Sequence, residues 1–410
     1  MIDPKALAPH YSRFRVDRGP SEEMPLLLTG HSHQAWPDRA RQGHIQAFDD
    51  AALMADAKWD RAFEMAGRVE AGFTRLLDDD SGTLTLASNT HELVVRFLSA
   101  LPLAKRPRLV TTDGEFHSIR RQLDRLEEEG LEVVRVPADD ADTLAERLAA
   151  AVDDRTAAVL VSAVLFGTSR IVPGLGRVLE ASQRHGAETL VDTYHALGAI
   201  PFSLRTEGLE GAYVVGGGYK YCQLGEGNCF LRVPPGCQLR PVITGWFAEF
   251  HVLADAPDDT VGYGEGANRF IGATYDPTSH YRGAAVFDFF QDQNLTPEAL
   301  RTLSQHQIRL LADGIDALDL DPAMARRLPG PLENYGGFLV LETPFAEGLH
   351  QALLDRNVRT DYRGERLRFG PAPYLTDEQL RAGVDALADA ASTVLRRTAP
   401  TASPVVSPVA

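Results

Sequence analysis

A chain of 410 residues exceeds the length at which a single hydrophobic core usually stops growing, so two domains are expected. The composition, 44% hydrophobic and 24% charged, is that of a globular protein, and no apolar run approaches the roughly 18 residues that a membrane span requires. A net charge of −16 without a basic stripe argues against nucleic acid or an anionic membrane as a partner.

The N-terminus and the cysteines predict a cytoplasmic protein. The first residues, MIDPKALAPHYSRFRVDRG, contain no apolar segment of the kind that a secretory signal has. Cys222, Cys229 and Cys237 are odd in number and lack the spacing of zinc ligands, which argues against a disulfide framework and a structural metal. We therefore expect a reducing compartment and no metal site.

Strand patterns alternate with helical patterns from about residue 80 to residue 232. Strands are predicted over 83–87, 108–112, 132–137, 157–166, 188–192 and 211–217, and helices over 88–101, 118–130, 141–152 and 172–186. The unbroken apolar run AAVLVSAVLF is typical of a strand that is buried on both faces. Strands separated by helices predict an α/β fold with a mainly parallel sheet and helices on both sides.

The C-terminal third has a different pattern, which predicts a smaller α+β domain. Helices are expected over 280–292 and 297–318, strands within 336–342 and 367–374, and a last helix from Thr376 or Asp377. We expect a large domain over 46–284 and a small domain formed by 1–45 and 285–397. The proline-rich tail, 398–410, is predicted to be disordered.

Polar residues follow the predicted strands at the edge of the sheet where such folds bind ligands. They are Asn89, Thr90 and His91; Glu115, Phe116 and His117; Thr168 and Ser169; Asp192 and His195; and Tyr219 and Lys220. Neither GxGxxG after the first strand nor GxxxxGK[ST] is present, so a nucleotide site would lack its phosphate loop.

Lys220 and Asp192 together indicate a pyridoxal 5′-phosphate (PLP) site. Lys220 lies in VVGGGYKYCQLGEGNCFL, just beyond one strand, and Asp192 ends the preceding strand. A lysine can form a Schiff base with the PLP aldehyde, and an aspartate can pair with its ring nitrogen. Taken alone, Lys220 could be a loop residue or could bind an anion. Asp192 could be the cap of a helix that begins at residues 193–197.

Other residues fit the same cofactor but have simpler interpretations. Phe116 could stack on the ring or belong to the core. Asn89 and Thr90 could bind a phosphate at a helix N-terminus or only cap that helix. His195 could be an ordinary histidine in a turn. Arg368, on an apolar strand, could grip a substrate carboxylate or form an internal salt bridge.

The motifs taken in order resemble the kynureninase family of class V, fold-type I PLP enzymes. They are GHSHQAWP near the start, VDTYHALGAIPFSL, GAYVVGGGYKYCQLGEGNCFL, TGWFAEF and LRFGPAPY. The resemblance extends over roughly residues 25 to 395. It implies that Lys220 is the Schiff-base lysine and proton carrier, Asp192 the partner of the ring nitrogen and Phe116 the stacking residue.

The resemblance also implies the remaining site residues. Asn89, Thr90, Tyr219 and His195 would hold the phosphate, and Arg368 and Ser32 would bind the amino-acid substrate. Members of this family form homodimers with shared active sites, and Trp246 and Thr274 would reach the cofactor of the partner chain.

The substrate residues depart from the family pattern, while the cofactor residues do not. His31 and His33 replace the usual asparagine and leucine, and Leu165-Phe166-Gly167 replaces an asparagine-tyrosine-arginine run. The usual aspartate after the stacking phenylalanine is missing from FHSIRRQ, and an asparagine that reads the substrate's aromatic part is not evident in GATYDPTS.

These features predict hydrolytic Cβ–Cγ cleavage of an aromatic amino acid such as L-kynurenine to alanine and anthranilate. A class V aminotransferase or a β-eliminating C–S lyase would use the same cofactor residues. A cysteine desulfurase is disfavoured because residues 238–410 contain no cysteine. A non-enzymatic regulator is disfavoured by the lack of a DNA-binding domain, and a degenerate homologue by the presence of both Lys220 and Asp192.

Overall fold

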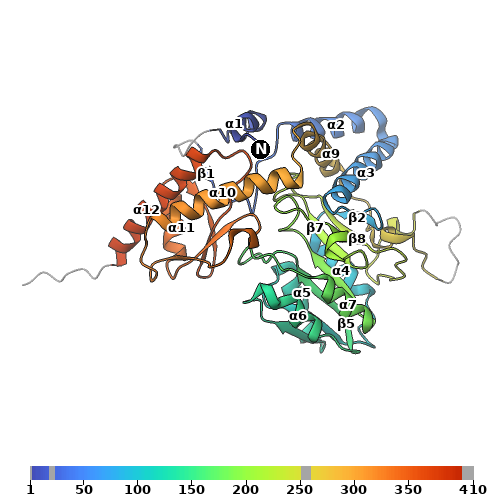
Figure 1. Ribbon diagram of the computed structural model, residues 1–410. Coiled ribbons are helices and arrows are strands. Elements are labelled where there is room, and N and C mark those ends of the chain that lie inside the picture. The colour runs from blue at the N-terminus through green and yellow to red at the C-terminus, as the bar shows by residue number, and fades with distance from the viewer. Residues whose placement is uncertain (1, 18–23, 251–259, 399–410) are drawn as a thin grey trace, which may run out of the picture.

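The computed structural model describes residues 2–17, 24–250 and 260–398 and forms two lobes (Figure 1). The tail predicted to be disordered lies outside these residues from 399 onward. The predicted alternation of strands and helices is confirmed, and most of the predicted strands lie within one or two residues of their expected bounds.

A seven-stranded sheet forms the larger lobe, with the strand order β2-β8-β7-β6-β5-β3-β4. Its strands are β2 (Thr83–Ala87), β3 (Arg108–Thr112), β4 (Glu132–Val136), β5 (Thr156–Ser162), β6 (Glu188–Asp192), β7 (Tyr213–Gly217) and β8 (Cys229–Val233). Strands β3 to β7 pair in parallel, whereas β8 is antiparallel to both of its neighbours. The predicted α/β class with a mainly parallel sheet is confirmed.

Helices cover both faces of this sheet. They include α3 (Lys58–Leu76), α4 (Thr90–Ala100), α5 (His117–Glu128), α6 (Ala141–Ala150) and α7 (Gly176–Arg184). Leu190 of β6 belongs to the core that α4 and α5 complete, and the next residue, Val191, belongs to the core that α6 and α7 complete. Successive side chains of a strand point to opposite faces, and this central strand is buried on both faces from Thr189 to Asp192.

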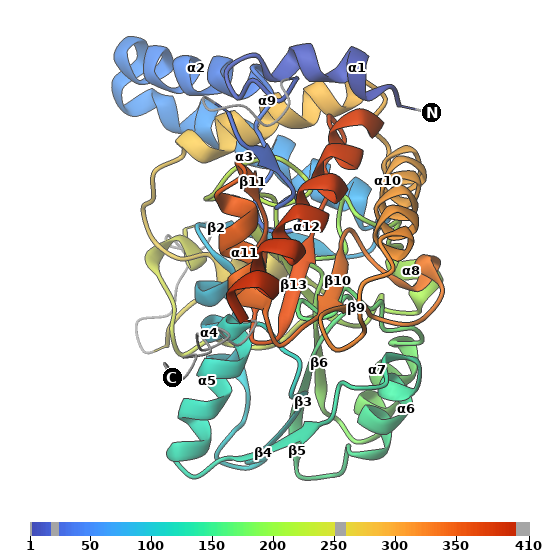
Figure 2. The ribbon, with the colours of Figure 1, turned by 90° about the vertical axis from the view of Figure 1, so that its left-hand side faces the viewer.

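A four-stranded antiparallel sheet forms the smaller lobe, in the order β12-β13-β10-β9. Its strands are β9 (Arg326–Arg327), β10 (Leu339–Glu342), β12 (Asp361–Arg363) and β13 (Arg366–Phe369). The accompanying helices are α10 (Pro297–Ala317), α11 (Ala346–Leu354) and α12 (Asp377–Thr398). Figure 2 shows α11 and α12 in front of this lobe.

The N-terminal segment pairs with the C-terminal region, and the division into two domains remains a prediction. Strand β1 (Leu26–Leu27) pairs in parallel with β11 (Val358–Arg359). Helices α1 (Pro4–Leu7), α2 (Arg39–Met54), α8 (Leu204–Glu207) and α9 (Thr278–Asp292) complete the set. The expected domain boundaries after residues 45 and 284 fall inside α2 and α9, which pack against each other.

Two local expectations are wrong. Residues 193–197 form turns and not a helix, and the strand predicted over 157–166 ends at Ser162. The turns arise because the Asp192 side chain accepts the N–H of Tyr194, and both the N–H and the hydroxyl of Thr193 bond to the Val215 carbonyl.

No helix in the described ranges is both long and apolar enough to span a bilayer.

Candidate functional site

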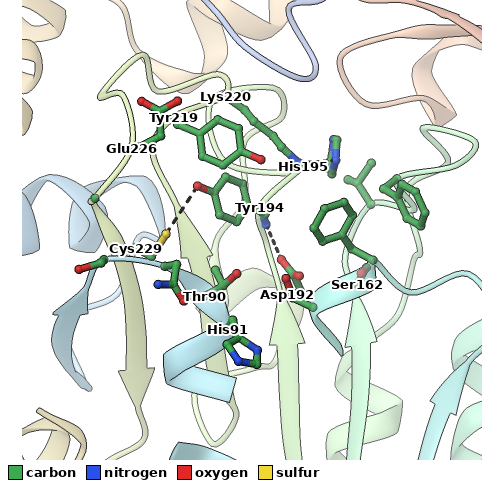
Figure 3. A pocket seen from close by; sticks show the side chains of 17 residues that line it. Thr90, His91, Ser162, Asp192, Tyr194, His195, Tyr219, Lys220, Glu226 and Cys229 are labelled. Atoms are coloured by element: carbon green, nitrogen blue, oxygen red, sulfur yellow. Dashed lines mark hydrogen bonds between the residues drawn. The ribbon is translucent and has the colours of Figure 1, made fainter. Parts of the chain in front are cut away.

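A cavity of about 420 Å³ lies at the carboxyl ends of β5, β6 and β7 (Figure 3). The N-terminus of α4 and the loop between β7 and β8 close its other sides. The residues that line it are Ser88, Asn89, Thr90, His91, Phe116, Ser118, Ser162, Val164, Phe166, Asp192, Tyr194, His195, Tyr219, Lys220, Glu226, Gly227 and Cys229. Seven of them are predicted cofactor residues.

Lys220 is a buried amine in this cavity. Its Nζ lies 2.7 Å from Nε2 of His195 (Figure 3). Burial disfavours the ammonium form and lowers the pKa of Lys220 to about 7, although the negative charge of Asp192 opposes this effect. A substantial fraction of the amine is therefore neutral near neutral pH, which is the form that a nucleophile or base requires.

The glycines around Lys220 allow close packing of its loop. A Cβ on Gly217 would lie 2.5 Å from the Tyr194 hydroxyl, and one on Gly218 would lie 2.4 Å from the Leu224 side chain. Gly225 has φ +66° and packs against Trp36, so a side chain there would be both strained and obstructed.

Distant segments fix this loop in place. The Gln223 side chain accepts a hydrogen bond from the Tyr11 hydroxyl (2.6 Å) and donates one to Gln34 (2.9 Å). Arg282 of α9 donates to the carbonyl of Leu224 (Nε–O 2.6 Å) and to that of Glu226. Its guanidinium also lies 4.5 Å from the centroid of the Trp36 ring. The N-terminal segment and α9 thus position the lysine loop.

Asp192 ends β6 at the base of the cavity. Its Oδ1 accepts the backbone N–H of Tyr194 at 2.8 Å (Figure 3). Burial raises the pKa of Asp192, while the Tyr194 N–H and the charge of Lys220 act in the opposite direction. A buried carboxyl group without a cation bonded to it is suited to pair with a protonated ring nitrogen.

Three aromatic rings lie around the amine of Lys220, whose Nζ is 5.6 Å from the centroid of the Tyr219 ring. The same Nζ lies 5.2 Å from the centroid of Phe116 and 4.8 Å from that of Tyr194. Aromatic side chains around a buried amine suit a flat cofactor ring. Sequence reasoning found Phe116 but missed Tyr194, which stands between two predicted residues in VDTYH and carries no signal that its ring enters the cavity.

The N-terminus of α4 borders the cavity. Asn89 is the N-cap, and its Oδ1 accepts the N–H of Glu92 at 2.9 Å. Thr90 begins the helix, and both residues line the cavity. The cap predicted from sequence is confirmed, and the free N–H groups of a first helical turn also suit a phosphate.

His195 and Tyr219 both line the cavity, but His195 contacts the lysine and not α4. Its Nε2 is next to Lys220, while its buried Nδ1 has no hydrogen-bond partner within the described chain. Tyr219 packs against the Tyr194 ring, with centroids 5.0 Å apart, and against His33, at 5.1 Å. A phosphate contact from His195 remains a prediction.

Arg368 is buried next to the cavity and bonded to Asp361. Its Nε donates to Oδ1 of Asp361 at 2.8 Å, Nη2 donates to Oδ2, and Nη1 donates to the Phe166 carbonyl at 2.6 Å. His31 also bonds to Asp361, with Nε2 2.8 Å from Oδ1. The internal salt bridge considered at Arg368 is present. It uses three of the five N–H groups, so two have no hydrogen-bond partner among the described residues, and the substrate contact of Arg368 remains a prediction.

Ser32, Trp246 and Thr274 do not line the cavity of their own chain. The Ser32 hydroxyl lies 3.2 Å from Nδ1 of His33. Trp246 Nε1 donates to the Thr274 hydroxyl at 3.3 Å, and the Trp246 ring is 47% exposed. Their roles remain predictions.

Sequence reasoning also missed Cys229 and Asp361. Cys229 lines the cavity with its Sγ 3.6 Å from the Tyr194 hydroxyl. Asp361 lies opposite Arg368 in the β12–β13 hairpin, which turns at Gly364 with φ +56°. The alternating residues on either side of RGE could have indicated this pairing.

The sequence matches no protein-family model, but it is similar to curated proteins. It is 28% identical to a kynureninase of Pseudomonas fluorescens over 235 residues, which cover 56% of this chain and 55% of that protein. It is 30% identical to a kynureninase of Xanthomonas campestris over 176 residues, 40% of each chain. The resemblance to the kynureninases is confirmed. The chain thus matches about half or less of the length of these kynureninases.

A third relative is aligned over more of the chain. The uncharacterized aminotransferase YcbU of Bacillus subtilis is 22% identical over 371 residues, which cover 90% of this chain and 95% of that protein.

Solved structures share the fold at low sequence identity. A mutant of the cystine C–S lyase C-DES, with glycine covalently linked to its PLP cofactor, has a TM-score of 0.78 and 18% identity and covers 89% of this chain and 96% of that chain. The cysteine desulfurase CsdA of Escherichia coli has a TM-score of 0.73 and 15% identity, with coverage of 97% and 99%. The chain therefore has the fold of the fold-type I PLP enzymes.

Proposed function

We propose that this protein is a PLP-dependent enzyme that acts on a small amino acid. The observation that carries the proposal is the position of the Lys220 amine, which faces the rings of Phe116 and Tyr194 in a cavity with Asp192 at its base. A lysine with a pKa lowered to about 7 and a buried carboxyl group are the two groups that PLP chemistry requires of a protein.

The residues present fit PLP in size and in chemistry. The cavity of about 420 Å³ has the volume of a small-molecule site. Phe116 and Tyr194 would hold the ring, Asp192 would pair with its nitrogen, and the first turn of α4 with Asn89 and Thr90 would bind the phosphate. The unpartnered Nδ1 of buried His195 leaves a hydrogen-bonding position that a polar ligand would fill.

When bound, PLP supplies an electron sink for a carbanion at the substrate Cα. The residues of this chain do the rest. Lys220, as the neutral amine, would remove the Cα proton and return it to product, and His195 would orient that amine through the 2.7 Å contact. Arg368 would bind the substrate carboxylate with its two remaining N–H groups, while Asp361 keeps the guanidinium in place.

The reaction that we propose is hydrolytic Cβ–Cγ cleavage of kynurenine or a related aromatic amino acid, which yields alanine and anthranilate. Sequence similarity to kynureninases of two bacteria supports it. The second candidate is transamination or β-elimination of a C–S bond, supported by the long alignment with YcbU and the structural similarity to C-DES. Both candidates use Lys220, Asp192 and Arg368.

We also propose a homodimer whose cavities are completed by Trp246 and Thr274 of the partner subunit. Large apolar side chains are exposed near these residues and on α2 and α3, among them Phe48 (76%), Leu53 (86%) and Phe63. Exposed large apolar side chains of this kind are often covered by a protein partner. Sedimentation would test the dimer, and mixing of Lys220→Ala with Trp246→Ala chains would test the sharing of sites.

A cytoplasmic location is part of the same proposal, and the three free, buried cysteines support it.

The decisive experiment combines a spectrum with product detection. Wild-type protein loaded with PLP should show the visible absorbance of lysine-linked PLP, and Lys220→Ala should abolish it with an unchanged circular dichroism spectrum. An unchanged cofactor spectrum in the variant would refute the assignment of Lys220.

The same loaded protein is then given L-kynurenine, its 3-hydroxy form or L-cystine. Fluorescent anthranilate, or its hydroxy form, together with alanine would support the kynureninase-type reaction. Release of pyruvate and sulfur products, or formation of an oxo acid with conversion of the cofactor to its amine form, would favour the second candidate. A visible spectrum without any turnover of these substrates would leave only the cofactor assignment standing.

A further inference from the structure

A second buried acid, Glu115, lies behind the cavity and has no role in the chemistry above. It immediately precedes the stacking residue Phe116 and is 2% exposed. Its Oε1 accepts the hydroxyl of Thr112 at 2.6 Å and the N–H of Ser162 at 3.2 Å, and its Oε2 accepts the hydroxyl of Ser162 at 2.5 Å. Three donors from β3 and β5 thus fix both carboxyl oxygens.

Ser162 connects this acid to the cavity. It lines the cavity next to Asp192, and the two residues are register partners on β5 and β6 (Figure 3). Ser162 is therefore bonded through its hydroxyl to Glu115 and is also the strand neighbour of Asp192, the acid expected to pair with the cofactor ring.

The charged group that acts on Glu115 from the neighbouring strands is Asp192. Burial raises the pKa of Glu115 to about 7, its bonds to Ser162 and Thr112 lower it, and the negative charge of Asp192 raises it further. Two carboxyl groups that interact in a buried site resist being ionised together, so the charge of one affects the proton affinity at the other.

The hydrogen bond between Ser162 and Glu115 can run in either direction. When Glu115 is ionised, Ser162 donates its hydroxyl proton to it and can only accept from the cavity. When Glu115 is protonated, it can donate to Ser162, whose own proton is then free to point into the cavity. The protonation state of Glu115 therefore determines whether the Ser162 hydroxyl can donate a hydrogen bond into the cavity beside Asp192 or can only accept one.

We propose that Glu115 is a positioning residue that, through Ser162, sets the proton affinity at the Asp192 end of the cofactor cavity. This inference rests on the proposed function, because a bound cofactor ring is the group whose protonation would respond. An ionised Glu115 stabilises a proton on that ring, and a neutral side chain at 115 does not.

The first test uses wild-type protein without cofactor. Infrared difference spectra between pH 6 and 8 should show the loss of a protonated-carboxyl band with a midpoint near 7. Glu115→Gln keeps the hydrogen-bond acceptor, cannot ionise and should remove this band. Glu70→Gln is the matched control, because burial also raises the pKa of Glu70, on α3, to about 7. Because Glu70 titrates in the same range, the band of Glu115 is the part of the wild-type difference spectrum that is lost in Glu115→Gln and kept in Glu70→Gln. Identical difference spectra of the wild type and of Glu115→Gln would overturn the inference.

The second test follows the visible spectrum of bound PLP against pH. We expect the midpoint of its titration to fall by about one pH unit in Glu115→Gln, a tenfold loss of proton affinity, and to stay unchanged in Glu70→Gln. Ser162→Ala should shift it in the same direction. An unshifted midpoint in Glu115→Gln would overturn the inference, and an unshifted midpoint in Ser162→Ala alone would overturn the role of Ser162. Absence of any bound-PLP absorbance in wild-type protein would instead overturn the proposed function and, with it, this coupling.

Discussion

Two buried arginines, Arg232 in the large lobe and Arg368 in the small lobe, are each bonded to an aspartate, yet they differ in what they leave free. Arg232 donates to Asp79 and Ser81 and to the carbonyls of Glu210 and Ala212. These bonds use all five of its N–H groups. Arg368 uses three of five, and it lies where its charge acts on Lys220 and His195.

The difference teaches that burial and a salt bridge do not by themselves separate a structural arginine from a binding one. What separates them is the number of guanidinium N–H groups that have no partner in the protein. A saturated guanidinium such as that of Arg232 can hold the chain together but cannot accept a ligand, whereas that of Arg368 can do both. Four predictions test this comparison.

Arg232→Met should have the largest effect, and that effect should be on stability alone. It leaves Asp79 buried without its cation, so we expect a loss of about 3–5 kcal/mol in the free energy of unfolding. Urea denaturation measures this loss. The visible spectrum of bound PLP, measured in the absence of urea, should match the wild type. A spectrum altered as much as the stability would mean that the two regions are not independent.

Arg368→Ala should act mainly on substrate binding. Loss of a charge-assisted contact costs about 1.5–3 kcal/mol, or roughly 10- to 150-fold in amino-acid affinity. Spectral titration of the PLP-loaded protein with L-kynurenine, or with whichever compound the turnover experiment identifies, measures it, with Arg232→Met as the control. Unchanged affinity in Arg368→Ala would make Arg368 a structural residue like Arg232.

Acid should weaken the Arg232 pair in a defined pH range. Bonds to Arg232 and Ser81 lower the pKa of Asp79 from 3.8 to about 2 against the opposing effect of burial. The stabilisation is therefore fully present above pH 3.8 and is lost as the pH falls toward 2, by about 2 kcal/mol. Denaturation curves of the wild type and of Asp79→Asn between pH 5 and 2 should converge, and parallel curves would contradict the prediction.

His31→Asn should have the smallest effect. Burial lowers the pKa of His31 to about 4, so it is neutral near pH 7 and donates to Asp361 through Nε2. Loss of this bond should weaken amino-acid affinity by about fivefold, or about 1 kcal/mol, with little change in stability. Ser81→Ala, the corresponding change beside Arg232, should lower stability and leave affinity alone. The reverse pattern would show that Arg232 contributes to substrate binding and that Arg368 is a structural residue.

The site residues that follow strands can be predicted from the sequence, because the end of a strand and the polar residues after it form a local pattern. Asp192, Lys220, Phe116 and Asn89 are all found in this way, and the sheet places them around one cavity. The antiparallel strand β8 was not predicted, since its run CFLRV follows a glycine-rich loop that hides the start of the strand.

What could not be predicted depends on side-chain direction. Tyr194 enters the cavity only because its backbone N–H is held by Asp192 and because Gly217 leaves room for its hydroxyl. Glu115, just beyond the end of β3, bonds to Ser162 of the neighbouring strand β5, 47 positions later in the sequence. Such contacts follow from packing, which a single sequence does not display.

The hold of the N-terminal segment on the lysine loop has a practical consequence for anyone who shortens this chain. Tyr11, Gln34 and Trp36 look dispensable, since they lie far from Lys220 in the sequence and outside the seven-stranded sheet. Yet their contacts reach Gln223, Gly225 and Arg282 around the loop. Trimming the first forty residues to ease expression or crystallisation would remove these supports, together with core residues such as Leu26 and Leu28, so such a truncation would weaken both the fold and the chemistry.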